Sequence, residues 1–99
     1  MTSEHKIFWT HEAINNLEEI LEYLKNRWTQ KEIDNFKKRL SKQIQIIEQN
    51  PKLFPKSQFN PRLRKAVLSS QTTIFYEVKN QTIYLAYLFN NKKDIERIK

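Results

Sequence analysis

The spacing of apolar residues changes halfway along the chain, and this change limits the possible folds more than any other feature of the sequence. Up to residue 50 apolar side chains return every three or four positions, whereas from residue 72 they alternate. The first spacing is typical of a helix face and the second of a strand. A chain with helices first and strands afterwards packs most economically as a helical layer against one sheet, which predicts an α+β fold.

Two amphipathic helices are predicted before residue 50. Thr10 is suited to cap the first, which we expect to end near Trp28. Thr29 and Glu32 match a capping box that starts the second, and the Asn50-Pro51 pair ends it. The link between the two helices is so short that they must form an antiparallel hairpin. Their apolar stripes are Ile14, Leu17, Ile20 and Leu24, then Ile33, Phe36, Leu40, Ile44 and Ile47.

Four strands complete the predicted order β-α-α-β-β-β, with the helix hairpin packed on a mostly antiparallel sheet. In residues 72–78 the alternation places Ile74, Tyr76 and Val78 on one face. The chain has no glycine, so Asn80 is expected to take the glycine position of the turn that follows. Residues 82–89 are apolar on both faces, which is typical of an interior strand. The predicted strands span 6–9, 64–68, 72–78 and 82–89.

A loop punctuated by prolines joins the second helix to the later strands, over residues 51–61. Its apolar residues Leu53, Phe54 and Phe59 are expected to fold it onto the core. At 99 residues the chain has room for one modest core, so we predict a single domain over residues 1–99.

Composition removes several classes of function. The chain has no cysteine, which excludes disulfides, thiolate nucleophiles, zinc fingers and iron–sulfur clusters. Without glycine it has neither a P-loop nor a dinucleotide-binding loop. His5 and His11 flank the first strand and lack the spacing of a helical metal pair, so we expect no metal and no cofactor. No membrane span or secretory signal is visible, and we expect a cytoplasmic protein without membrane contact.

The excess positive charge lies entirely in the second half of the chain. The formal net charge is +7, yet residues 1–50 contain equal numbers of basic and acidic side chains. No acidic residue occurs between Glu48 and Glu77. So uneven a field attracts polyanions or an acidic protein and bears on the partners more than on the fold.

Four cations flank two predicted strands and form the sharpest candidate site. Arg64-Lys65 opens the second strand and Lys92-Lys93 follows the fourth. If these strand ends share one rim of the sheet, the cations converge there. We therefore predict a target-binding or nucleic-acid-binding surface at Arg64, Lys65, Lys92 and Lys93. The alternative interpretation is a set of scattered, solvated side chains.

Five strings occur in order along nearly the whole chain and together resemble a known family. They are Phe8-Trp9-Thr10 with the following Ala13, Leu17, Ile20 and Tyr23-Leu24; Asn50-Pro51; Arg64-Lys65-Ala66-Val67; Ile74-Phe75-Tyr76-Glu77-Val78; and Phe89-Asn90-Asn91-Lys92-Lys93-Asp94. In this order they are similar to the RelE/ParE toxins of bacterial type II toxin–antitoxin systems. The resemblance implies a growth-inhibiting, plasmid-stabilising toxin that a cognate antitoxin neutralises.

The resemblance leaves two targets open, because some members cleave mRNA in the ribosome and ParE-like members bind DNA gyrase and stall it on broken DNA. Ribonuclease members tend to carry an arginine where this chain has Thr73, and a further Arg, Tyr or His near the C-terminus. The last five residues here contain neither Tyr nor His. We therefore favour gyrase binding without catalysis. The alternative is a metal-independent endoribonuclease that clamps phosphate with Arg64 and Lys93.

Two further expectations concern partners. Antitoxins of the family lay a flexible, often acidic segment across the toxin, which screens its cations and covers its apolar surface. For that contact we predict exposed helix rims and neighbouring cations, at Tyr23, Trp28, Phe36, Arg62 and Arg64. A third interpretation, outside the toxin class, is a non-toxic basic module that binds nucleic acid.

Overall fold

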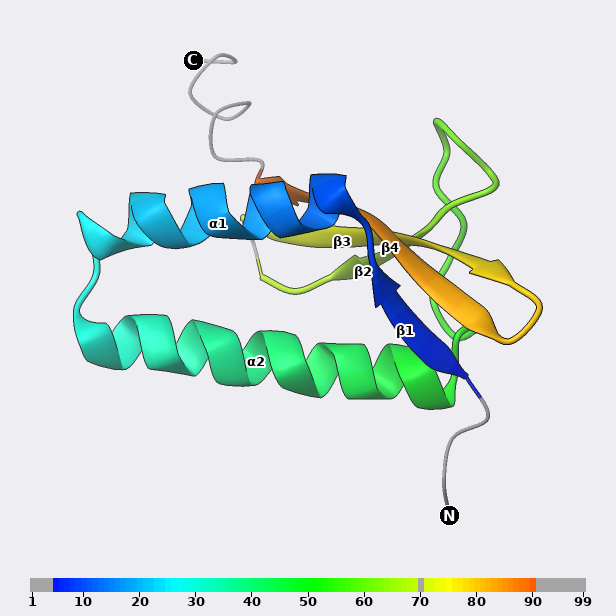
Figure 1. Cartoon of the computed structure of the whole chain (residues 1–99), viewed down its shortest axis with the longest axis horizontal. Helices are drawn as coiled ribbons and strands as arrows, with labels where there is room; N and C mark the ends of the chain where they lie inside the picture. The colour runs from blue at the N-terminus through cyan, green and yellow to red at the C-terminus, as the bar shows by residue number, and fades with distance from the viewer. Residues whose placement is uncertain (1–4, 70, 91–99) are drawn as a thin grey trace.

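The fold of a computed structural model follows the predicted element order, and the structure describes residues 5–69 and 71–90. Two helices run antiparallel to each other in Figure 1, beside a sheet of four strands. The α+β class and the order β-α-α-β-β-β are therefore confirmed. The elements are β1 (Lys6–Trp9), α1 (His11–Lys25), α2 (Gln30–Gln49), β2 (Arg64–Val67), β3 (Thr72–Lys79) and β4 (Thr82–Asn90).

The sheet has the strand order β1-β4-β3-β2. β4 pairs parallel with β1 and antiparallel with β3, and β3 pairs antiparallel with β2. The apolar strand β4 is thus an interior strand, as its sequence predicts. Since β2 and β4 both run antiparallel to β3, they point in the same direction, which places the start of β2 and the end of β4 far apart along the strands.

Both helices begin at the caps that the sequence indicates. The Thr10 side chain accepts a hydrogen bond from the Ala13 amide, and Thr29 forms a complete capping box with Glu32. α1 ends at Lys25, three residues before the predicted end at Trp28. The Trp28 amide still donates to the Leu24 carbonyl, 2.7 Å away, so one more hydrogen bond of helical spacing forms in the turn after the helix has ended.

α1 covers the part of β4 that β1 leaves without a partner. The register of β1 ends where Trp9 meets Leu85. Beyond it, the Thr10 hydroxyl donates to the Leu85 carbonyl at 2.7 Å, and the Leu88 amide donates to Asn16 Oδ1 at 3.0 Å. Side chains of α1 thereby satisfy backbone groups that would otherwise form an open sheet edge.

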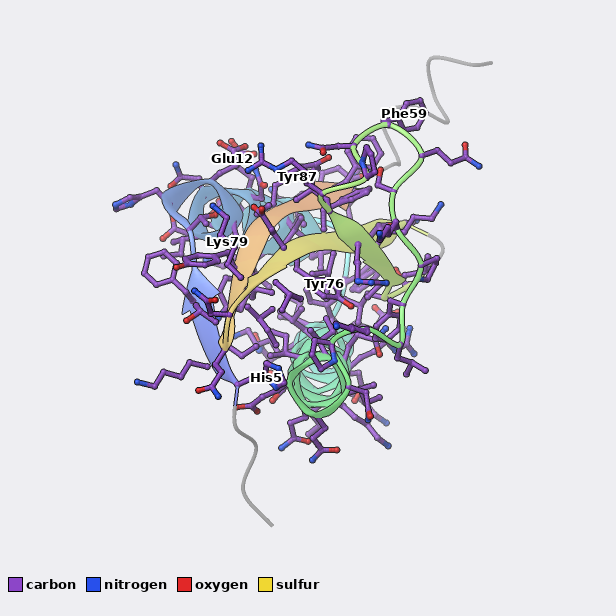
Figure 2. The ribbon with its side chains drawn as sticks, turned by 90° about the vertical axis from the view of Figure 1, so that its right-hand side faces the viewer. His5, Glu12, Phe59, Tyr76, Lys79 and Tyr87 are labelled. Carbon is purple, nitrogen blue, oxygen red and sulfur yellow. The ribbon has the colours of Figure 1, made fainter. Side chains whose placement is uncertain are left out.

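The core lies between the helices and one face of the sheet. Ile74, Tyr76 and Ile83 are fully buried there, and Figure 2 shows Tyr76 between the sheet and α2. The Tyr76 hydroxyl donates to the Pro51 carbonyl at 2.7 Å, which ties β3 to the end of α2. The β3–β4 turn contains Asn80 at φ 55°, so an asparagine takes the left-handed position as predicted.

The loop between α2 and β2, residues 50–63, differs from the prediction that its apolar residues fold onto the core. Phe54 packs against the core and meets the Tyr76 ring edge-on, at 6.4 Å between centroids. Leu53 and Phe59 are 64% and 96% exposed, so for these two the prediction is wrong. The buried positions of the loop are taken instead by Pro51, Leu63 and Ser57, whose hydroxyl accepts hydrogen bonds from the amides of Phe59 and Asn60.

Candidate functional site

Four cations converge where the 50–63 loop meets the start of β2 and the end of β3. Lys52, Lys56, Arg62 and Arg64 line an open recess of about 410 Å³, together with Glu77. Lys56 forms an isolated antiparallel bridge with Arg64, which folds the loop back beside β2. We call this site the basic recess. It is the part of the described chain where the positive charge of the second half gathers.

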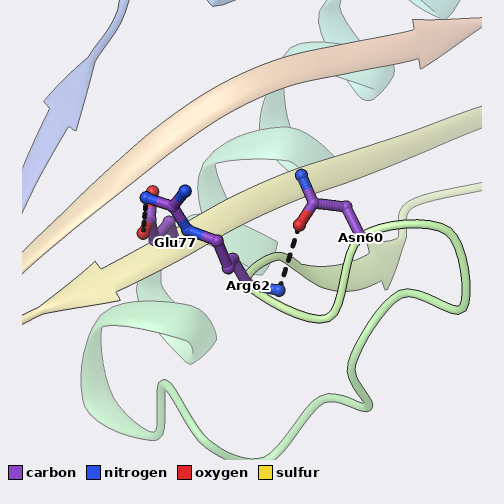
Figure 3. A network of polar contacts seen from close by, with 3 residues as sticks. All are labelled: Asn60, Arg62 and Glu77. Carbon is purple, nitrogen blue, oxygen red and sulfur yellow. Dashed lines mark hydrogen bonds and ion pairs between the residues drawn. The ribbon is translucent and has the colours of Figure 1, made fainter.

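The carboxylate in the basic recess is engaged by one of these cations. Arg62 Nη2 lies 3.4 Å from Glu77 Oε2, and the Arg62 amide donates to Asn60 Oδ1 at 3.1 Å (Figure 3). The Arg62 side chain is 72% exposed and Glu77 only 23%. Arg62 can therefore leave Glu77 at small cost, because an exposed ion pair contributes less than about 1 kcal/mol.

Arg64 is held more firmly than Arg62. Its guanidinium donates to the Phe54 carbonyl at 2.6 Å, and its side chain is partly buried. Burial raises the pKa of the neighbouring Tyr76 from 10.0 to about 12, and the positive charge of Arg64 lowers it in part. Because its hydroxyl is buried and bonded to Pro51, Tyr76 is not placed to pass a proton to a ligand in the recess.

The two strand ends next to the four predicted cations do not lie at the same rim of the sheet. Arg64 pairs with Tyr76, which pairs with Leu85, whereas β4 continues five residues further, to Asn90. The expectation that the start of β2 and the end of β4 share a rim is wrong, because the two strands run in the same direction. Lys65 lies next to Arg64 on β2, and Lys92 and Lys93 lie outside the described residues.

A second, larger recess of about 860 Å³ lies between α1 and the end of β4. Glu18, Glu19 and Glu22 line it, with apolar surface from Ile20 and Leu88. Tyr23 also lines it, and the Arg27 guanidinium stacks over the Tyr23 ring at 4.5 Å. We call this site the α1 recess; it is concave, and it combines acidic with apolar surface.

The residues predicted for antitoxin contact are spread over the molecule. Tyr23 lies in the α1 recess, and Trp28 packs partly buried against the core. Arg62 and Arg64 lie in the basic recess. Phe36 is only 6% exposed and belongs to the core, so its expected position on an exposed helix rim is wrong. It lies on the α2 stripe that faces inward.

Lys52 and Lys56 were missed as site residues by sequence reasoning. The signal that could have found them is the stretch without acids between Glu48 and Glu77, which contains them both. Their convergence with Arg62 depends on the path of the loop, which no periodicity encodes. His5 and His11 lie before β1 and at the start of α1, and neither lines the basic recess.

The described residues, 5–69 and 71–90, contain neither a metal-binding cluster nor a helix that could span a membrane. Within them, no three His, Cys, Asp or Glu side chains are grouped so that they could hold a metal ion. Neither of the two helices described has the length and apolar character needed to cross a bilayer.

Comparisons with known proteins point to one family. A family model described as the ParE toxin of the type II toxin–antitoxin system parDE matches residues 7–97. No curated protein sequence matches the chain significantly. Among solved structures, the chromosomal ParDE system of P. aeruginosa contains a chain that superposes with a TM-score of 0.76 at 14% identity, covering 90% of this chain and 98% of that one.

Two further solved structures share the fold at lower similarity. One is a copper-bound mutant toxin from Helicobacter pylori, with a TM-score of 0.55, 15% identity and coverage of 90% of this chain and 97% of that one. The other is YafQ from E. coli strain BL21(DE3), with a TM-score of 0.57, 11% identity and coverage of 92% and 97%. At such identities these likenesses concern the fold alone.

Proposed function

We propose that this chain, which belongs to the ParE toxin family of type II toxin–antitoxin systems, inhibits growth by binding DNA gyrase and not by catalysis. The membership makes it a toxin component, and the choice of target is our inference. The resemblance of its sequence to ParE-like members supports gyrase. The action would take place in the cytoplasm, where gyrase works on DNA.

The composition of the basic recess carries this proposal. Metal-free RNA cleavage needs a group that removes a proton from the 2′-hydroxyl and another that protonates the leaving oxygen. Within the described residues, the titratable side chains that line the recess are four cations and Glu77, Glu77 pairs with Arg62, and the adjacent Tyr76 is buried. This arrangement supports binding of an acidic surface better than it supports proton transfer.

The cognate antitoxin is proposed to reach both ends of the molecule. Figure 1 shows the turn between α1 and α2 at one end of the long axis and the 50–63 loop at the other. Tyr23 and Trp28 belong to the first end, and Arg62 and Arg64 to the second. The long axis measures 38 Å, so an extended segment that contacts both needs about 12 residues at roughly 3.3 Å per residue.

The test separates gyrase binding from ribonuclease activity. The protein is induced in cells, and two products are measured in parallel: gyrase–DNA cleavage complexes, and new 5′ ends in ribosome-bound mRNA. We expect cleavage complexes to accumulate without codon-positioned mRNA cuts, and co-expressed antitoxin to abolish them. Cuts in ribosome-bound mRNA without cleavage complexes would contradict the proposal and support the endonuclease alternative.

A further inference from the structure

The loop that forms the basic recess presents a fully exposed aromatic ring. Phe59 is 96% exposed, the highest exposure among the large apolar residues of the described chain. Figure 2 shows it at the outer end of the loop, directed away from the sheet and the core. A ring in this position contributes nothing to the packing of the core, so its apolar surface stays available for a partner.

The ring is exposed on an ordered loop. The Ser57 amide donates to the Leu63 carbonyl at 2.8 Å, which closes the loop at its base. The buried Ser57 hydroxyl oxygen accepts from the amides of Phe59 at 3.2 Å and Asn60 at 3.4 Å. These bonds fix the backbone that carries the ring. Little conformational freedom is then lost when a partner covers it, which favours tight binding.

Cations flank this apolar tip along the loop. Lys56 and Arg62 stand on the same loop three residues before and after Phe59, and both line the basic recess. Leu53, 64% exposed, adds apolar surface in the same loop. An aromatic centre with a charged rim is the usual composition of a protein–protein hot spot.

We propose that Phe59 is an anchor that inserts into an apolar pocket, rimmed with carboxylates, on the folded protein that this toxin inhibits. The inference rests on the proposed function and names the contact that the basic recess makes. The shape of the tip favours a folded target over the antitoxin, because a projecting side chain fits a preformed pocket. A flexible antitoxin segment can instead follow the concave surfaces of the two recesses, and the Phe59 ring lines neither of them.

Nucleic acid is the less favoured occupant. An apolar side chain can wedge between DNA bases, but its flanks must then face phosphates on both sides. A continuous phosphate backbone that follows the recess would have to pass Glu77, which lies among its cations and repels any anion. The carboxylates of an acidic protein surface can instead pair with Arg62 and Lys56 individually.

The variant that tests the proposal is Phe59→Ser. Since the ring is almost fully exposed, the substitution is expected to leave the melting temperature and the affinity for antitoxin unchanged. Growth arrest on induction and inhibition of gyrase supercoiling by the purified protein should both weaken at least about tenfold. Phe59→Trp keeps an aromatic anchor and should retain activity, and Val67→Thr is the control for an exposed apolar residue outside the loop.

Each outcome decides the proposal. If Phe59→Ser arrests growth as strongly as the wild type, the anchor is disproved whatever the target. If it lowers affinity for antitoxin, or for DNA alone, to the same degree as it lowers toxicity, another partner covers the ring and the proposal is overturned. If the wild type arrests growth without acting on gyrase, the proposed function fails; a selective loss of arrest in Phe59→Ser would still support an anchor for a different protein target.

Discussion

The α1 recess and the basic recess lie at opposite ends of the β3–β4 ladder and differ in charge and shape. The α1 recess uses Leu88 and Asn90, near the pairing of Asn90 with Thr72. The basic recess uses Val78, which pairs with Ile83 next to the β3–β4 turn. Both are concave, but three glutamates line the first, whereas four cations line the second, which borders a projecting loop.

We infer from this difference that the two ends contribute differently to recognition, since the antitoxin is proposed to contact both ends and the target only the loop end. A surface that repels one partner by charge discriminates as effectively as a surface that attracts the other. An acidic target is attracted to the loop end and repelled by the glutamates of α1. If the two ends act independently, a change at one end should leave the function of the other intact, and the largest effect is expected at the loop end.

Reversing the charge of the loop end should have the largest effect. In the double variant Lys52→Glu and Lys56→Glu, the concentration needed to inhibit gyrase is expected to rise about 10- to 100-fold, because the steering field of the recess is lost. Both side chains are exposed, so the fold should not change. The measurement is a supercoiling assay at several salt concentrations, in which the wild type should weaken with salt more steeply than the variant.

The matched control for charge is the pair Lys37→Glu and Lys38→Glu, exposed on α2. It changes the net charge by the same amount but away from both recesses. Equal loss of inhibition in the two double variants would mean that total charge matters and its location does not, which would remove the distinction between the two ends.

Removing the Tyr76 hydroxyl should lower the stability of the whole protein. Tyr76→Phe leaves the Pro51 carbonyl without this hydrogen bond, and the expected loss is about 1–3 kcal/mol in the free energy of unfolding. For a chain of this size each kcal/mol corresponds to roughly 4–8 °C in melting temperature. Thermal unfolding measures the loss, and an unchanged melting temperature would show that the bond is unimportant.

The same variant changes the response to alkali. The pKa of Tyr76 is about 12 in the folded protein against an ordinary 10.0, so folding favours the neutral phenol. The stability that this group contributes is complete below pH 10 and is lost as the pH rises toward 12. Tyr76→Phe should lack this loss, so the two unfolding curves should approach each other over that pH range.

A smaller effect is expected at the other end of the ladder. Asn16→Ala removes the acceptor of the Leu88 amide, and the expected loss is about 1 kcal/mol. Hydrogen exchange of the Leu88 amide should accelerate, and antitoxin binding should weaken while gyrase inhibition persists. Asn35→Ala, exposed on α2 and outside both recesses, is the control. Loss of gyrase inhibition in Asn16→Ala without unfolding would show that the two ends are coupled.

The smallest effect is expected from Glu77→Gln, which removes the carboxylate from the basic recess. Stability should change by less than about 1 kcal/mol, because the Arg62 partner is exposed. Affinity for the target should rise about two- to threefold through the stronger positive field. Glu18→Gln makes the same charge change in the α1 recess and should leave target affinity unchanged. A decrease with Glu77→Gln would mean that the carboxylate itself contacts the target.

The sequence was most informative where the interactions are local. The Thr29–Glu32 capping box joins residues three apart, and the positive φ of Asn80 depends on the turn alone, so both were predictable. The alternation in β3 also predicted that Ile74 and Tyr76 share a buried face, because period 2 follows from strand geometry.

The sequence was least informative where geometry depends on residues far apart. Whether the ends of β2 and β4 share a rim depends on strand order and direction, which no string in the chain states. In the 50–63 loop, hydrophobicity placed Phe59 inside, but hydrogen bonding buries Ser57 and directs the ring outward. The candidate site was therefore predicted in its charge and in part of its residues, and missed in its location.

The parallel pairing of β1 with β4 has a consequence for how this toxin is made. Lys6 finds its partner at Thr82, 76 positions later, so almost all of the intervening chain must leave the ribosome before the sheet can close. Such distant pairing slows folding. A translation product that stops before residue 82 lacks β4, the strand that pairs with β1 and contacts α1. A copy cut short before residue 82 is therefore expected to lack the fold on which toxicity depends.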